Sequence, residues 1–139
     1  MIDIENLVYT NIRNAIKAYN SAIDVQGIHV DVPSTFPHVS IVETDNSADA
    51  STISTSDREY SAELTYTVNI YTNTANAKTV ARAIANVVND AFTGIGFVRS
   101  MMQVAPNIDR TIYRLILRYQ ATAWKAYDGA DGHYNITSR

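Results

Sequence analysis

Two stretches of the chain place apolar residues three and four positions apart, which is the spacing of one face of an α-helix. The first predicts a helix over residues 3–22, with acidic side chains in its first turn and Gly27 shortly after it. The second predicts a helix between the cap candidates Asn73 and Thr74 and Gly94, a residue type that often ends helices in a left-handed conformation. The predicted apolar faces are Ile4, Leu7, Val8, Ile12, Ala15, Ile16, Tyr19 and Ile23 in the first helix and Val80, Ile84, Val87, Val88 and Ala91 in the second.

Elsewhere apolar and polar residues alternate, which predicts β-strands. The predicted strands cover residues 28–32, 37–43, 59–72, 97–104 and 111–127. In the clearest of them, Tyr60, Ala62, Leu64, Tyr66, Val68 and Ile70 share one face and Glu59, Glu63, Thr65, Thr67 and Asn69 share the other. Residues 111–123 also fit helical spacing, and periodicity alone does not separate the two. Alternation together with many β-branched and aromatic residues favours a strand there.

Two segments contain too few apolar residues to be buried. Residues 44–57 are almost all Ser, Thr, Asp, Asn and Ala, which predicts a long exposed loop of the kind that often carries function. Residues 128–139 contain two glycines and predict a flexible C-terminal tail. Residues 1–127 then form a single α+β domain, with two amphipathic helices packed on one face of a mostly antiparallel four- to five-stranded sheet. The predicted order is α-β-β-(long loop)-β-α-β-β.

The composition supports one core without staples. The chain has 139 residues, of which 46% are hydrophobic, and this suffices for a single domain. It has no cysteine, which excludes disulfides, thiolate nucleophiles and Cys-ligated zinc. No apolar run reaches the roughly 18 residues of a membrane span, and the N-terminus is acidic where a signal peptide is basic. We therefore expect an unexported chain with no membrane partner.

The residue types that usually carry chemistry do not form a motif. His29, His38 and His133 are isolated, with no second metal ligand at helical spacing. The serines include no Gly-x-Ser-x-Gly elbow, residues 93–96 lack the third glycine of a dinucleotide cradle, and residues 128–132 lack the later glutamate of a calcium loop. We expect no catalytic residue, no metal and no cofactor.

Two charged stripes are candidates for a subunit interface. The last predicted strand places arginines and isoleucines on one face, and the polar face of strand 59–72 carries two glutamates. The arginine stripe consists of Arg110, Ile112, Arg114, Ile116 and Arg118, and the glutamate stripe consists of Glu59 and Glu63. The alternative is ordinary cross-strand pairing on a solvated face, worth at most about 1 kcal/mol per pair.

A family resemblance rests on several short segments. Residues 66–73, YTVNIYTN, precede an alanine-rich helix, and they are followed by Gly96-Phe97-Val98-Arg99, Pro106-Asn107 and Thr111-Ile112-Tyr113-Arg114. These segments and the order of elements, from the first helix through about Ala123, resemble the tail-terminator (tail-completion) proteins of long-tailed bacteriophages. The resemblance implies a non-enzymatic subunit of a ring, usually a hexamer. The ring caps the tail tube, ends tail growth and meets the head-completion (neck) proteins, in the tail or neck of a virion assembled in the host cytoplasm.

The implied partners agree with the charge and with the predicted loop. DNA would pass through the lumen without sequence-specific binding, and a net charge of −3 does not favour a grip on phosphates. Ring contacts are heterologous, so the two charged stripes are the candidate surfaces. The candidate contacts with tube or head proteins are Asp45, Asn46, Asp49, Ile53, Asp57 and Arg58. The alternatives are another head-tail connector ring protein, of the head-closure (stopper) kind, or a small cytoplasmic ligand-binding or enzymatic α+β module.

Overall fold

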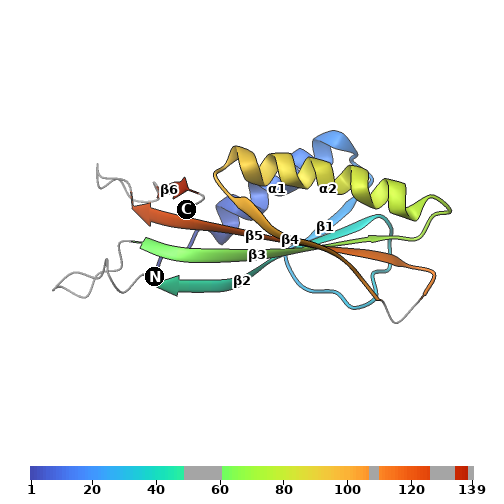
Figure 1. Cartoon of the computed structure of the whole chain (residues 1–139). Coiled ribbons are helices and arrows are strands. Elements are labelled where there is room, and N and C mark those ends of the chain that lie inside the picture. Colours follow the sequence, from blue (N-terminus) through green and yellow to red (C-terminus); the bar gives the residue numbers. More distant parts are fainter. Residues whose placement is uncertain (49–60, 107–109, 126–133, 138–139) are drawn as a thin grey trace.

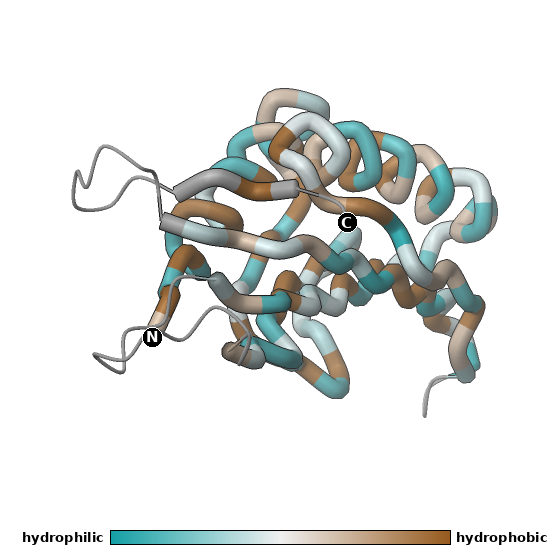
Figure 2. The backbone as a smooth tube through the Cα atoms, turned by 60° about the vertical axis from the view of Figure 1, so that its left-hand side comes forward, coloured by the Kyte–Doolittle hydropathy of each residue, from teal (hydrophilic) through white to brown (hydrophobic). Residues whose placement is uncertain are grey.

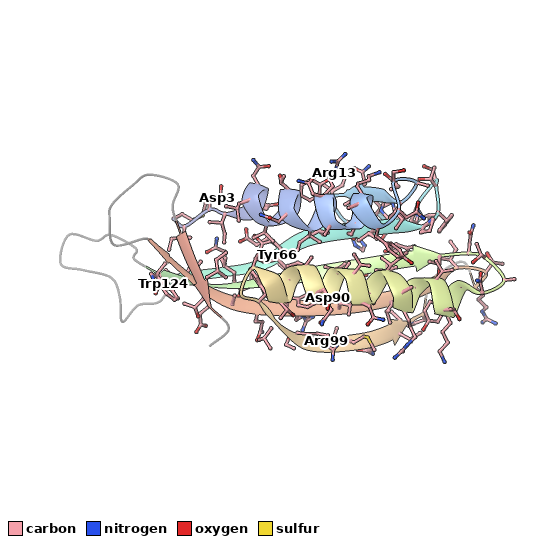
Figure 3. All side chains as sticks on the ribbon, turned by 90° about the horizontal axis from the view of Figure 1, so that it is seen from above. Asp3, Arg13, Tyr66, Asp90, Arg99 and Trp124 are labelled. Carbon is pink, nitrogen blue, oxygen red and sulfur yellow. The ribbon has the colours of Figure 1, made fainter. Side chains whose placement is uncertain are left out.

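The computed structural model describes residues 1–48, 61–106, 110–125 and 134–137, and it confirms the α+β class (Figure 1). The elements in chain order are α1 (Glu5–Tyr19), β1 (Asp24–Gln26), β2 (His38–Ala48), β3 (Ser61–Thr72), α2 (Ala77–Gly94), β4 (Val98–Ala105), β5 (Tyr113–Lys125) and β6 (Tyr134–Thr137). Both helices lie on the same face of the sheet (Figure 1), with α1 beside α2 when the molecule is seen from above (Figure 3).

The six strands form one mixed sheet in the order β1-β2-β3-β5-β4, and β6 also pairs with β5. β1 runs parallel to β2, whereas all the other neighbours are antiparallel, as the sequence predicted for most of the sheet. β4 pairs with residues 114–120 of β5 and β6 pairs with residues 122–125. The two strands therefore follow one another along the same edge of β5.

The core lies between the helices and the sheet. The predicted apolar face of β3 is buried there from Ala62 to Ile70, while Tyr60 lies outside the described residues. The alternate residues Leu115 to Ala123 of β5 are buried beside it, and α1 and α2 add a buried stripe each. Figure 2 shows brown, apolar residues recurring between teal, polar ones along the helices and strands. At the centre, Phe92 of α2 stacks on Tyr119 with ring centroids 4.2 Å apart. Phe97 meets the same phenylalanine edge-on, and the Tyr66 ring lies tilted against it.

Two predictions about the early strands need correction, and one strand, β1, was not predicted. Residues 28–32 form no strand, and Ile28 and Val32 are 66% and 57% exposed. The strand before them is β1, which pairs in parallel with β2. Parallel neighbours need a long connection that returns the chain to the starting end, and residues 27–37 serve as this connection. Residues 44–48 are not loop but the end of β2, because their backbone pairs with β3 although their side chains are polar.

The helix ends and the C-terminal segment also differ from prediction. α1 is shorter than residues 3–22, and Leu7 and Tyr19 of its predicted apolar face are 44% and 53% exposed. Gly94 is the last residue of α2, while the left-handed residue after the helix is Gly96, with φ of 100°. The predicted tail 128–139 includes β6, because β5 extends past β4 and its free edge pairs with residues 134–137. Residues 49–57 of the predicted loop lie outside the described residues.

Strand was the correct assignment for the segment that also fitted a helix. β5 spans Tyr113–Lys125, and Leu115, Leu117, Tyr119, Ala121 and Ala123 are buried under the helices. Residues two positions apart lie on the same face of a strand, so this alternation buries one whole face of β5. In a helix the same residues would point in different directions around the axis.

Candidate functional site

The sheet face opposite the helices, here called the helix-free face, is covered at one end only. The connection 27–37 passes beneath the sheet in Figure 1. At that end the outward residues are buried, although several are polar. They are His38, Ser40, Asn69 and Tyr71. The opposite end of the helix-free face holds a shallow polar hollow, lined by Asp45, Glu63, Leu64, Thr65, Gln120, Ala121 and Thr122.

A His–Asp pair anchors β1 to β2 under this connection. His38 Nδ1 lies 2.9 Å from Asp24 Oδ2, which also accepts a hydrogen bond from the Thr35 hydroxyl at 3.1 Å. Burial would raise the pKa of Asp24, but hydrogen bonds from Gln26, His38 and Thr35 and the charge of His38 lower it below its usual value. The carboxylate is therefore held in its charged form, which ties the connection to the sheet.

The neighbouring Ser40 does not complete a nucleophilic triad. A serine nucleophile needs a hydrogen bond to its base and access to substrate. Ser40 is fully buried, and neither its hydroxyl nor His38 Nε2 has a hydrogen-bond partner within the described residues. The cluster is best explained as a structural anchor.

The predicted arginine stripe is divided by the structure. Arg114 Nε donates a hydrogen bond of 3.0 Å to Asn69 Oδ1, and its guanidinium lies 5.6 Å from the centre of the Tyr71 ring. Ile112 is 8% exposed and Ile116 is half-buried. These residues are engaged within the subunit, whereas Arg110 and Arg118 are exposed and have no ion-pair partner in the described part of the chain.

The predicted glutamate stripe does not meet these arginines within one copy. Glu63 is exposed and lies opposite Thr122, while Arg118 lies opposite Thr67. Four residues along a strand correspond to about 13 Å, so the two charges do not pair. Glu59 lies outside the described residues. The interface assignment stays a prediction, for which Arg110, Arg118 and Glu63 are available.

The predicted partner-contact segment is only partly described. Asp45 and Asn46 belong to β2, and Asp49, Ile53, Asp57 and Arg58 lie outside the described residues. Asn46 Nδ2 donates to the Ile2 carbonyl at 2.8 Å, so this side chain fastens the N-terminal segment to β2. Asp45 is exposed.

An acidic group surrounds the N-terminus of α1. Glu43 of β2 lies near Asp3 and Glu5, and its Oε1 accepts a hydrogen bond of 3.4 Å from the Tyr66 hydroxyl. Burial, and then the negative charges of Glu5 and Asp3, raise the pKa of the Glu43 carboxyl above its usual value. Asp45 lies two residues further along β2, on the helix-free face of the same edge strand. Asp3, Glu5, Glu43 and Asp45 are called the acidic group below.

This electrostatic strain predicts that Glu43→Gln stabilises the protein at neutral pH. The pKa of Glu43 is higher in the folded state than in the unfolded state, so the free energy of unfolding falls as the pH rises through the folded pKa. Above that pH the charged carboxylate destabilises the folded state by a constant amount. The amide keeps an acceptor for Tyr66 but carries no charge. We expect a rise of a few degrees in Tm at pH 7, with no difference from the parent protein below about pH 4.

The measurement is a series of thermal melts across pH. Glu63→Gln is the matched control, because Glu63 is exposed on the other face of the sheet and should leave Tm unchanged. A lower Tm for Glu43→Gln at pH 7 would contradict the prediction, since the hydrogen bonds to the carboxylate would then outweigh the repulsion.

The outer edge of the sheet at β4 is a candidate surface that the motif search missed. Val98, Met102 and Val104 are 47%, 37% and 53% exposed, and β4 has no further strand beside it among the described residues. Residues 100–105, SMMQVA, carry no charge. This uncharged run is the feature of the sequence that could have indicated the β4 surface, because exposed edge strands usually carry charges.

The described residues offer little for other kinds of site. No group of three or more His, Cys, Asp or Glu among them could hold a metal ion. None of the described helices is long and apolar enough to span a membrane.

No protein-family model matches the chain, and no curated protein matches it. Among solved structures, a chain in the virion of a native gene transfer agent particle is similar, with 20% identity and a TM-score of 0.58 over 81% of this chain and 88% of that chain. The match to the gp17 protein of bacteriophage SPP1 covers 83% of this chain and 88% of the gp17 chain, with 16% identity and a TM-score of 0.39. The protein therefore shares its fold with a chain of the gene transfer agent virion.

Proposed function

We propose that this protein is a structural component of a phage-type virion that forms a ring, usually a hexamer, at the end of the tail tube, where it ends tail growth and joins the tail to the head. The observation that carries the proposal is the fold shared with a chain of a gene transfer agent virion over 88% of that chain. The short segments that resemble tail-terminator proteins support the same assignment. Its partners would be copies of itself, the tail-tube protein and the neck proteins.

The surface supports assembly better than it supports a reaction. Among the described residues, the pair of buried His38 and partly exposed Asp24 lies beside Ser40, a serine that substrate cannot reach. By contrast, β4 exposes apolar side chains along an open edge, and Arg110, Arg118 and Glu63 have no partner among the described residues. Open strand edges that carry exposed apolar side chains are typical of surfaces that contact another subunit.

The first test is the solution mass of the purified protein by light scattering, alone and with the tail-tube protein of the same particle. We expect a ring of several 15.4 kDa chains, either free or formed on the tube. A monomer that ignores the tube protein at every concentration would refute the proposal.

A genetic test distinguishes the two connector rings. Particles made without a tail-terminator should show filled heads with overlong or unjoined tails by electron microscopy. Heads that leak their DNA would instead identify a head-closure protein.

A further inference from the structure

The charges of the chain are divided between its two halves. Residues 1–63 contain ten acidic and three basic residues, whereas residues 64–127 contain two acidic and seven basic ones. The net charge of −3 hides this division. A strong asymmetry between halves indicates surfaces of opposite sign when the halves fold onto different sides of the molecule.

The fold does separate the two halves. α1, β1 and β2 come from the first half and lie at one side of the sheet, while α2, β5 and β4 come from the second and lie at the other. Figure 3 shows Asp3 beside α1 and Arg99 on β4 at opposite sides of the molecule. The acidic group lies on the first side. The second side carries the exposed cations Lys78, Arg82, Arg99, Arg110 and Arg118, here called the basic group.

Two residues depart from this division. Arg13 is an exposed cation on α1, and Asp90 is an exposed acid on α2. A third charge on the acidic side, Lys17, is engaged locally, because its Nζ donates to the Ile23 carbonyl at 2.6 Å. Each side therefore keeps an excess of one sign.

We propose that the β4 edge of one copy docks onto the β2 edge of a second copy, so that the basic group meets the acidic group head to tail. The inference rests on the proposed ring, whose contacts must be heterologous. Both edges are open, since β1 covers only His38–Ser40 of β2 and the rest of that strand has no outer neighbour among the described residues.

The strand directions permit this contact. β2 and β5 run in the same direction, and β4 runs opposite to both, because each step from β2 through β3 and β5 to β4 is antiparallel. A second copy related by rotation about an axis along the strands would place its β2 antiparallel to β4, as in the rest of the sheet. The exposed Val98, Met102 and Val104 would then be covered.

Edge strands that stay free usually carry protection against such pairing, in the form of charges, prolines or bulges. β4 has a bulge near Arg99, but its remaining residues, Met101–Ala105, include neither a charge nor a proline. On the other side, Glu43 lies close to Asp3 and Glu5 in a single copy, and a basic neighbour would relieve that repulsion.

The test exchanges charges between the two sides. One variant carries Arg99→Glu and Arg118→Glu, and the other carries Glu5→Lys and Asp45→Lys; all four residues are exposed, so that both variants should fold. Each variant alone should assemble only at a protein concentration at least roughly tenfold higher than the parent protein requires. Light scattering or sedimentation measures assembly, with the tube protein present if the parent protein needs it. An equal mixture should assemble again, because the four exchanged positions then carry opposite charges across every contact of an alternating ring.

The controls separate the possible failures. Arg13→Glu makes the same kind of substitution once, on α1, and should not weaken assembly. Assembly that survives both double variants would overturn the proposed surface and leave the ring intact. Loss in the arginine variant alone, without rescue in the mixture, would show instead a two-fold contact between β4 edges. A parent protein that stays monomeric even with the tube would refute the ring itself.

Discussion

Replacing Phe92 by alanine is expected to lower the free energy of unfolding by about 3–5 kcal/mol. Phe92 is fully buried, and its ring stacks on Tyr119 at 4.2 Å and meets Phe97 edge-on at 5.3 Å. The substitution removes these contacts and leaves a cavity between α2 and the sheet, which rigid neighbours on several elements cannot fill. Urea unfolding followed by circular dichroism measures the loss.

The matched control is Tyr19→Ala, another aromatic side chain on a helix but 53% exposed. It should change the free energy of unfolding by less than about 0.5 kcal/mol. A loss below about 1 kcal/mol for Phe92→Ala would mean that the aromatic cluster repacks around the missing ring.

The second large effect is expected at Gly96, where alanine should cost about 1–3 kcal/mol from backbone strain alone. Gly96 has φ of +100°, a conformation that side chains disfavour, and a Cβ there would lie 2.6 Å from the Ile136 carbonyl oxygen. β6 would have to move away from the end of α2. We therefore expect faster hydrogen exchange of the backbone amides in β6 and lower thermal stability.

Gly94 offers a control only two residues away. It lacks a positive φ, and a Cβ there would meet no atom within 4 Å. Gly94→Ala should be neutral or stabilise the protein by up to about 1 kcal/mol, because alanine favours the helix. Equal behaviour of the two alanine variants would show that the approach of β6 to Gly96 does not restrain the fold.

The elements that could be predicted are those whose own side chains divide into two faces. α1, α2, β3 and β5 each bury one regular face, so their periodicity carries the information. β1, β6 and the end of β2 lack this pattern, because they are held by backbone pairing with a longer neighbour. Asn46 is an example: it is polar and lies in a polar segment, but its backbone pairs with Leu64 of β3.

The candidate surface was predictable in part for a similar reason. Alternation placed Arg114 and Arg118 on one face correctly, since both lie on β5. It could not show that Arg114 is bound to Asn69, which lies 45 residues away along the chain. Whether a charged side chain is free to contact another subunit depends on such distant neighbours. The uneven number of charges in the two halves, by contrast, is visible in the sequence itself.

The separation of the two halves has a consequence for how related sequences would vary. Each of the two proposed docking sides comes from one continuous half of the chain, with the central strand β3 between them. A change of charge near Asp45 would be compensated near Arg99 of the adjacent copy, although the two residues lie on opposite sides of their own subunit. If the proposed ring forms, correlated substitutions between the halves that no contact within one chain explains would record its geometry.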